Sequence, residues 1–189
     1  KWRYSRDSVH RIQEKLEIKK TAEYYQVIFN QDLGVMKSLW SESKYDASEH
    51  GTKLIQKILG REIASQFSYP KSIHTVNDFI NAGTGEFENP TILDYFAGSG
   101  TTGHAVINMN RKSRSNHRKY ILVEMGDYFD SVLKPRIKKV IYCDEWKEAQ
   151  PVNRNSGLSH CFKYIRLESY EDTLNNIDLK KGTSENGTF

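Results

Sequence analysis

The chain has 189 residues, of which 37% are hydrophobic, 28% charged and 12% aromatic. This composition is too apolar and too aromatic for a disordered chain, so it predicts a packed core. No run approaches the roughly 20 apolar residues that a membrane-spanning helix needs. The N-terminus lacks the apolar stretch of a secretory signal peptide and an initiator methionine, and we interpret the sequence as a fragment.

The net charge is +4, which is compatible with a nucleic-acid partner but does not require one. Two cysteines, Cys143 and Cys161, are too few for a disulfide framework, and no Cys/His cluster indicates zinc. A reducing, cytoplasmic location without a bound metal or a membrane contact is therefore expected. The most basic stretch is RKSRSNHRK, residues 111–119, which we interpret as a solvated connection between two apolar segments.

The first 85 residues predict an irregular α+β segment followed by helices. Apolar spacing, β-branched residues and helix-stop glycines indicate a helix over 7–20, a strand over 24–29 and a helix over 49–60 that ends at Gly60. A further helix should open at Pro70, carry Ile73, Val76, Phe79 and Ile80, and close at Gly83.

From Pro90 onward strands and helices alternate. The predicted order is a strand over 90–96, a turn over 97–100, a helix over 101–110, a strand over 119–125, a helix over 126–142 and a strand over 160–168. Pro135 should kink or divide the second of these helices. Ser169 and Asp172 then form a capping-box start for a last short helix.

This alternation predicts an α/β fold with a doubly wound, mostly parallel, Rossmann-like sheet that is incomplete in this chain. We expect three regions. Residues 1–49 would be the end of a target-recognition or connecting region, residues 50–178 a cofactor-binding half-domain, and residues 179–189 a frayed tail.

The most informative stretch is ILDYFAGSGTTGHAV, residues 92–106. Gly98, Gly100 and Gly103 satisfy the pattern G-x-G-x-x-G between a predicted strand and a predicted helix, where a turn without Cβ atoms can approach a ligand. Glu124 ends the next strand, the position at which such folds hold a ribose through its hydroxyls. A purely structural turn and a surface glutamate are the alternatives, but their pairing favours a nucleotide-type site.

Asp94 at the tip of the first strand decides between ligands. A carboxylate there would repel the pyrophosphate of a nicotinamide cofactor, but it could accept hydrogen bonds from an ammonium group. S-adenosylmethionine carries an ammonium, a carboxylate and no phosphate. The charge argument therefore favours S-adenosylmethionine.

These residues resemble known motifs. DYFAGSGTT, residues 94–102, resembles motif I of the DNA amino-methyltransferases, FSYPKS, residues 67–72, resembles their motif X, and RKYILVEM, residues 118–125, resembles motif II. The segments over 128–142 and 162–176 resemble the C-terminus of type III restriction–modification methylation subunits, which are N6-adenine DNA methyltransferases. The resemblance extends over about residues 50–178.

The resemblance implies a cofactor site built from twelve residues. Asp94 would face the methionine ammonium, Glu124 would hold the ribose and Met125 would lie against the adenine. The remaining positions would shape the pocket or approach the cofactor carboxylate: Lys71, Ser72, Phe96, Ala97, Gly98, Ser99, Gly100, Thr101 and Thr102. A solvated lysine is the alternative for Lys71.

The resemblance also exposes an absence in the sequence. These enzymes bind the flipped-out base with a Pro-Pro-aromatic loop, but no two of the four prolines here are adjacent. The chain is thus predicted to be the C-terminal cofactor-binding part of a DNA methyltransferase, inactive alone and without catalytic residues of its own. Its partners would be double-stranded DNA through the complete enzyme, and a restriction subunit or a second copy.

Two other functions stay open at the level of sequence. A nicotinamide-dependent oxidoreductase could use the same glycine turn, and it would not respond to S-adenosylmethionine. A non-catalytic DNA-interaction module would use the basic stretch over 111–119, and it would bind DNA regardless of cofactor.

Overall fold

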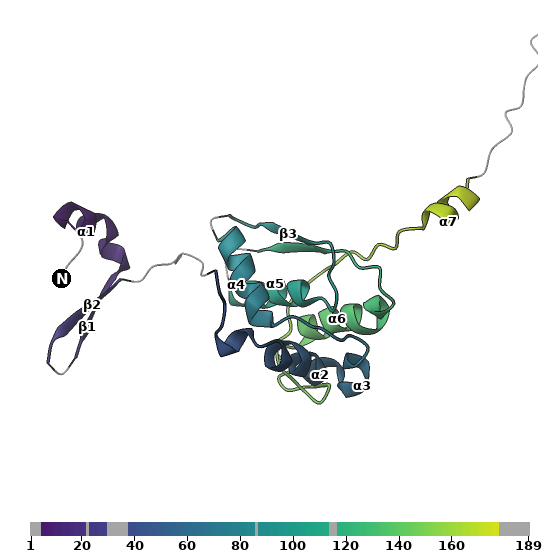
Figure 1. Ribbon diagram of the computed structural model, residues 1–189, viewed down its shortest axis with the longest axis horizontal. Helices are drawn as coiled ribbons and strands as arrows, with labels where there is room; N and C mark the ends of the chain where they lie inside the picture. Colours follow the sequence, from purple (N-terminus) through teal and green to yellow (C-terminus); the bar gives the residue numbers. More distant parts are fainter. Residues whose placement is uncertain (1–4, 22, 30–37, 86, 114–116, 178–189) are drawn as a thin grey trace, which may run out of the picture. The chain divides into compact units, whose positions relative to one another are not determined.

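The computed structural model describes residues 5–21, 23–29, 38–85, 87–113 and 117–177 (Figure 1). The chain divides into a unit over residues 1–158 and a smaller unit over residues 159–189. In the described part of the chain, no helix combines the length and the apolarity needed to cross a membrane.

The N-terminal segment is a short helix followed by a hairpin. Helix α1 (Arg6–Ile12) and the turn η1 (Gln13–Lys15) lead into β1 (Leu16–Lys20), which pairs antiparallel with β2 (Tyr25–Phe29). The predicted strand is confirmed, whereas the predicted helix over 7–20 is wrong from Leu16 onward. Strand pairing with an aromatic and β-branched partner outweighs the helical propensity of LEIKK.

Two helical turns and three helices follow. The turns η2 (Ser43–Tyr45) and η3 (Ser48–Thr52) precede α2 (Lys53–Leu59), α3 (Arg61–Ala64) and α4 (Ile73–Thr84). Gly60 ends α2 with a φ of 88°, as predicted. Helix α4 opens at Ser72, whose side chain accepts a hydrogen bond from the His74 amide, and not at Pro70. Phe79 is exposed and does not join the core.

A parallel strand pair organises the larger unit. Strand β3 (Thr91–Asp94) is connected through α5 (Thr101–Lys112) to β4 (Lys119–Leu122), and Asp94 lies opposite Leu122 in the register. The mixed α/β class with a parallel sheet is thereby confirmed. In the described residues this sheet has two strands, so the predicted double winding stays a prediction.

The helix predicted over 126–142 is divided, as expected from its proline. A π-helical turn, η4 (Phe129–Leu133), precedes α6 (Lys134–Tyr142), with Pro135 in the first turn of α6. The hairpin β5 (Trp146–Lys147) and β6 (Gln150–Pro151) follows. Side chains from α2, η4 and α6, joined by Ile107 of α5, form one buried cluster, and other side chains of α5 form a second cluster with α4.

The sheet is covered by helices on one face. Ile92, Tyr120 and Leu122 pack against the two clusters, while Leu93 and Ile121 on the other face are 62% and 52% exposed. Figure 1 shows the helices α4, α5 and α6 on the same side of the strand pair. An apolar sheet face is therefore left open.

The smaller unit contains one described helix. Helix α7 (Tyr170–Asn175) starts at Ser169, whose hydroxyl accepts a hydrogen bond from the Asp172 amide at 3.1 Å, and this capping prediction is confirmed. The strand predicted over 160–168 is wrong, because this segment has no regular secondary structure. Its alternating sequence pairs with no other strand of the described residues.

Candidate functional site

The glycine turn between β3 and α5 has the backbone that its sequence demands. Gly98 and Gly100 have φ angles of 55° and 80°, a region in which side chains with a Cβ are strained. A Cβ on Gly98 would lie 3.0 Å from Cζ of Phe67. The turn is therefore formed with an aromatic ring packed directly against it.

Gly103 has a packing role instead of a conformational one. A Cβ there would lie 2.7 Å from Cδ1 of Ile137 and 2.9 Å from Cδ1 of Leu122. The missing side chain lets α5 approach both β4 and α6, which is the task of the third glycine in such turns. Gly98 and Gly100 thus allow the backbone of the turn, and Gly103 allows the close packing of α5.

Asp94 ends β3 and is held by two local hydrogen bonds. One carboxylate oxygen accepts from the Phe96 amide at 3.2 Å, and the other accepts from the Thr102 hydroxyl at 2.5 Å. Each carboxylate oxygen can accept two hydrogen bonds. One position on each oxygen therefore remains for a donor outside this network, and an ammonium group is such a donor.

Glu124 connects the turn after β3 to the turn after β4. Its Oε2 accepts from the Gly98 amide at 2.7 Å, and its Oε1 accepts from the Met125 and Gly126 amides, both at 2.9 Å. Burial alone would raise the pKa of Glu124, but these amides hold it below its usual value. The carboxylate stays ionised and fixes the two turns to each other.

Large apolar side chains at this edge of the sheet have no cover. Tyr95, Phe96 and Met125 are 64%, 81% and 94% exposed. They flank the two carboxylates Asp94 and Glu124 in the sequence. Exposed aromatic and Met side chains beside fixed polar groups are the composition of a small-molecule site.

Ser99 and Thr101 point the other way, into the protein. Their side chains are 2% and 5% exposed, and both hydroxyls lie within hydrogen-bond distance of the guanidinium of Arg136. Ala97 and Gly100 are also buried. These four positions can contribute backbone groups to a ligand, while the side chains of Ser99 and Thr101 support the turn from within the protein.

The two motif X positions have contacts elsewhere. Lys71 is exposed, and Ser72 is 2% exposed. The Ser72 hydroxyl donates to the Lys44 carbonyl at 2.9 Å and accepts from the His74 amide at 3.3 Å. The observed role of Ser72 is to cap α4, and a cofactor contact for either residue stays a prediction.

Several side chains around the turn were missed by the sequence analysis. Phe67 stacks edge-on against Tyr128, with 4.8 Å between the ring centroids, and the hydroxyl of Tyr128 hydrogen-bonds to Glu124. Arg136 and His104 lie beneath the turn. Only Phe67 carried a signal, since it opens FSYPKS, and KPRIKK has the composition of a solvated basic helix.

Arg111 shows that part of the basic stretch is structural. Its guanidinium donates to the Val140 carbonyl at 2.7 Å and to the Ser156 carbonyl at 3.3 Å. It therefore joins the end of α5 to the end of α6. The prediction of a merely solvated connection is wrong for this residue, and residues 114–116 of the stretch lie outside the described residues.

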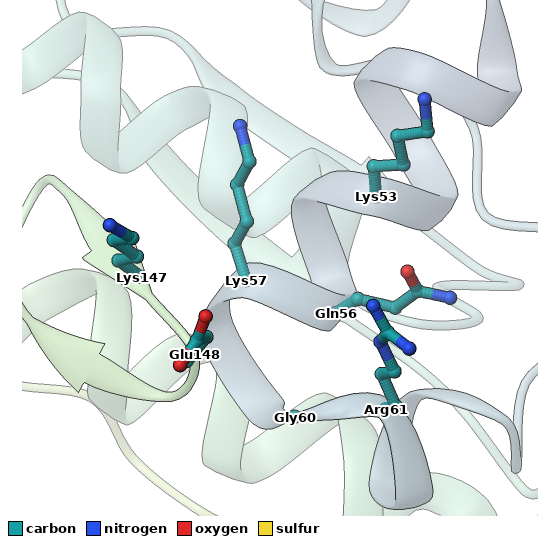
Figure 2. A pocket seen from close by; sticks show the side chains of 7 residues that line it. All are labelled: Lys53, Gln56, Lys57, Gly60, Arg61, Lys147 and Glu148. Atoms are coloured by element: carbon teal, nitrogen blue, oxygen red, sulfur yellow. The ribbon is translucent and has the colours of Figure 1, made fainter.

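A separate hollow of about 670 Å³ lies between α2, the start of α3 and the β5–β6 hairpin (Figure 2). Its lining residues carry four cations and one carboxylate, and they are Lys53, Gln56, Lys57, Gly60, Arg61, Lys147 and Glu148. None of them belongs to the predicted cofactor site. Four cations would repel the sulfonium and ammonium of S-adenosylmethionine, so this hollow suits an anion instead.

The described residues contain no group of three or more His, Cys, Asp or Glu side chains placed to hold a metal ion.

Comparison with known families agrees with this geometry. A family model described as DNA methylase, N6_N4_Mtase, matches residues 2–134. The chain belongs to this family. The match includes β3, the glycine turn, α5 and β4, and it begins well before the segment on which the sequence resemblance was recognised. The resemblance to the DNA amino-methyltransferases is thereby confirmed, and the nicotinamide alternative loses its support.

Curated relatives refine the comparison. The chain is 35% identical over 91 residues to the type III restriction-modification enzyme EcoPI Mod subunit of Escherichia phage P1, an alignment that covers 48% of this chain and 13% of the relative. It is 36% identical over 89 residues to the type II methyltransferase M.KpnI of Klebsiella pneumoniae, covering 47% and 20%. It is 39% identical over 72 residues to the EcoP15I Mod subunit of Escherichia coli, covering 38% and 11%. The aligned part of the chain thus spans at most a fifth of the length of these relatives.

Proposed function

We propose that this chain is the cofactor-binding part of a DNA methyltransferase that transfers a methyl group from S-adenosylmethionine to the N6 amino group of adenine in restriction–modification. The observation that carries the proposal is the position of Asp94 and Glu124 at the ends of adjacent parallel strands, on either side of the glycine turn. The names of the type III relatives support the restriction–modification assignment, and the choice of adenine rests on the resemblance of the segments over 128–142 and 162–176 to type III methylation subunits.

The residues present fit such a cofactor. Asp94 keeps one free acceptor position on each oxygen for the ammonium, and the N-terminus of α5 offers backbone amides to the carboxylate. Met125 and Phe96 supply exposed apolar surface for the adenosine. Glu124 already accepts from three amides and from the Tyr128 hydroxyl, which fill its four acceptor positions, so a ribose hydroxyl would bind it by displacing the Tyr128 hydroxyl.

The bound cofactor supplies an electrophilic methyl group, and the chain contributes position. The carboxylates and the glycine turn would hold the methyl donor in one position, which lowers the entropic part of the barrier to a direct displacement. No Pro-Pro loop occurs among these 189 residues, so the residues that hold the amino group of the base would lie outside them. We therefore expect incorporation of radiolabelled methyl groups into duplex DNA by this chain alone to stay at background.

The basic hollow supports DNA as the partner. Lys57, Arg61 and Lys147 are exposed and line the same hollow (Figure 2). Cations grouped in this way can neutralise phosphates of a DNA backbone without reading the sequence. The hollow would therefore contribute affinity for duplex DNA and no specificity.

The test of the proposal is calorimetric titration with S-adenosylhomocysteine, the demethylated product, against the wild-type chain and Asp94→Ala. Binding should weaken about 10- to 100-fold, because a hydrogen bond to a charged group contributes about 1.5–3 kcal/mol. Asp144→Ala, which removes an exposed carboxylate in the turn after α6, is the matched control and should bind like the wild type. Equal binding by the wild type and Asp94→Ala would refute the assignment of the site.

A further inference from the structure

Arg136 is a fully buried arginine beneath the glycine turn. It lies on α6 with 0% exposure. One terminal nitrogen contacts the Ser99 carbonyl at 3.2 Å, the Ser99 hydroxyl at 2.9 Å and the Thr101 hydroxyl at 3.0 Å. The other terminal nitrogen lies 3.2 Å from Nδ1 of His104. The guanidinium thus contacts the turn, the first residue of α5 and the first helical turn behind it.

The charge of this guanidinium is not balanced by an acid. The described residues form no ion pair with Arg136, and its Nε has no hydrogen-bond partner among them. Burial lowers the pKa of Arg136 to about 9, which still leaves it protonated at neutral pH. A buried cation without a counter-charge opposes folding, because desolvation costs more than neutral hydrogen bonds return.

The position of the cation adds to this cost. Arg136 lies at the N-terminal end of α5, a helix of 12 residues, where the helix dipole is positive and disfavours another positive charge. Arg111 offers the contrast, because it lies at the C-terminal end of the same helix, where a cation is favoured. Arg136 therefore makes the electrostatic potential at the start of α5 more positive, and no acidic side chain of the described residues pairs with it.

We propose that Arg136 is a positioning residue for the carboxylate of the cofactor, holding the turn over Ser99–Thr101 from behind and supplying the positive charge that this carboxylate meets at the start of α5. The inference rests on the proposed function, because the anion is the carboxylate of the methionine part. The helix amides contact the ligand, and the arginine acts through them. An anion bound on the outer side of the turn would be stabilised both by the buried charge of Arg136 and by the positive end of the helix dipole.

The experiment compares two ligands that differ in that carboxylate. S-adenosylhomocysteine carries it, whereas 5′-methylthioadenosine keeps the adenosine and the thioether but has no amino-acid part. Calorimetry on the full chain should show that Arg136→Met weakens binding of S-adenosylhomocysteine by about tenfold or more. Binding of 5′-methylthioadenosine should stay within about twofold, because its contacts do not involve the charge.

Two further variants separate positioning from folding. Arg136→Lys keeps the charge but loses the planar fork, so the ratio of the two affinities should stay close to that of the wild type even if the thermal midpoint falls. Arg111→Met removes a second arginine of the region, which is partly buried, and it should lower the thermal midpoint while leaving the ratio of the two affinities unchanged.

The outcomes are distinguishable. The inference is overturned if Arg136→Met weakens the binding of both ligands equally or of neither. It is also overturned if Arg136→Lys lowers the ratio of the affinities for S-adenosylhomocysteine and 5′-methylthioadenosine as much as Arg136→Met does. If the wild-type chain fails to bind S-adenosylhomocysteine at all, the proposed cofactor itself is wrong.

Discussion

His104 is a buried histidine that has to stay neutral. Its side chain is 3% exposed, and burial followed by the charges of Arg136 and Arg111 lowers its pKa well below the usual value. Because the guanidinium of Arg136 can only donate, Nδ1 of His104 accepts and Nε2 carries the proton. Protonation would therefore break this contact and place two cations side by side.

A pH-dependent stability follows from this histidine. In the unfolded chain His104 takes up a proton near pH 6.5, whereas in the folded chain it does not. The unfolded state thus binds more protons below that pH, so the free energy of unfolding should fall as the pH falls, by up to about 1.4 kcal/mol per pH unit. Urea titrations between pH 7 and pH 5 measure this slope.

The control for this prediction is another histidine. His104→Gln should flatten the slope, while His117→Gln, at an exposed position, should leave it as in the wild type. A slope that is the same in His104→Gln and in the wild type would show that other groups govern the acid sensitivity.

Gly103 and Gly83 offer a matched pair of helix glycines. Gly103→Ala should destabilise the chain by about 1–3 kcal/mol, because the new methyl group collides with Ile137 and Leu122. Gly83→Ala in α4 has nothing within 4 Å of its Cβ, so it should stabilise the chain by about 1 kcal/mol through helix propensity. Thermal unfolding of both variants measures the contrast, and equal shifts would contradict the packing role.

The polar residues at the strand ends could be predicted because each lies at a fixed offset from an apolar run. Asp94, Glu124 and the glycines follow from that spacing, and the structure brings them together. Arg136 could not be predicted, since nothing in KPRIKK distinguishes the one cation that faces inward from its solvated neighbours.

At the scale of elements, the β5–β6 hairpin holds an unusual turn. Glu148 and Ala149 have φ angles of 50° and 63°, a region that costs residues other than glycine about 1–2 kcal/mol. The strain is held by contacts on both sides. The Ala149 amide donates to the Lys57 carbonyl at 2.9 Å, and Lys139 donates to the carbonyls of Ile58 and Ala149.

Relief of this strain should be measurable. Ala149→Gly should raise the free energy of unfolding by about 0.5–1 kcal/mol, because glycine adopts the positive φ without strain. Ala82→Gly, at an exposed position in α4, is the control and should lower it by about 1 kcal/mol. Destabilisation by both changes, measured by urea unfolding, would contradict a strained turn at Ala149.

The sequence predicted elements well where they were long or bounded by glycine, as at α5 and α2, whereas the strand predicted over 119–125 starts correctly but ends at Leu122. It failed at 16–20 and at 160–168 for one physical reason, which is that strand formation depends on a partner. Leu16–Lys20 has β2 as its partner, whereas residues 160–168 have none among the described residues. Local alternation carries no information about that partner.

At the scale of the whole molecule, the proposed role of the basic hollow in DNA binding leads to a prediction about salt dependence. Neutralising Lys57, Arg61 and Lys147 to alanine should weaken duplex binding for every sequence alike, and the salt dependence should fall by about one unit per lost phosphate contact. Fluorescence anisotropy across a salt series measures both quantities.

The control removes the same charge elsewhere. Lys112, Lys119 and Lys138 are exposed and lie outside the hollow. Their replacement by alanine should leave the salt dependence close to that of the wild type. If both triple variants lose affinity equally, the chain attracts DNA only through its net charge.

The open sheet has a consequence for the behaviour of this chain in solution. Strands β3 and β4 form a two-stranded sheet in the described part of the chain, so each strand has one edge whose backbone groups no strand covers, beside the exposed Leu93 and Ile121. An uncovered edge next to an apolar face is a template for another strand. An uncovered edge of this kind favours self-association, so at high concentration the strand that pairs with it would come from a second copy of this chain.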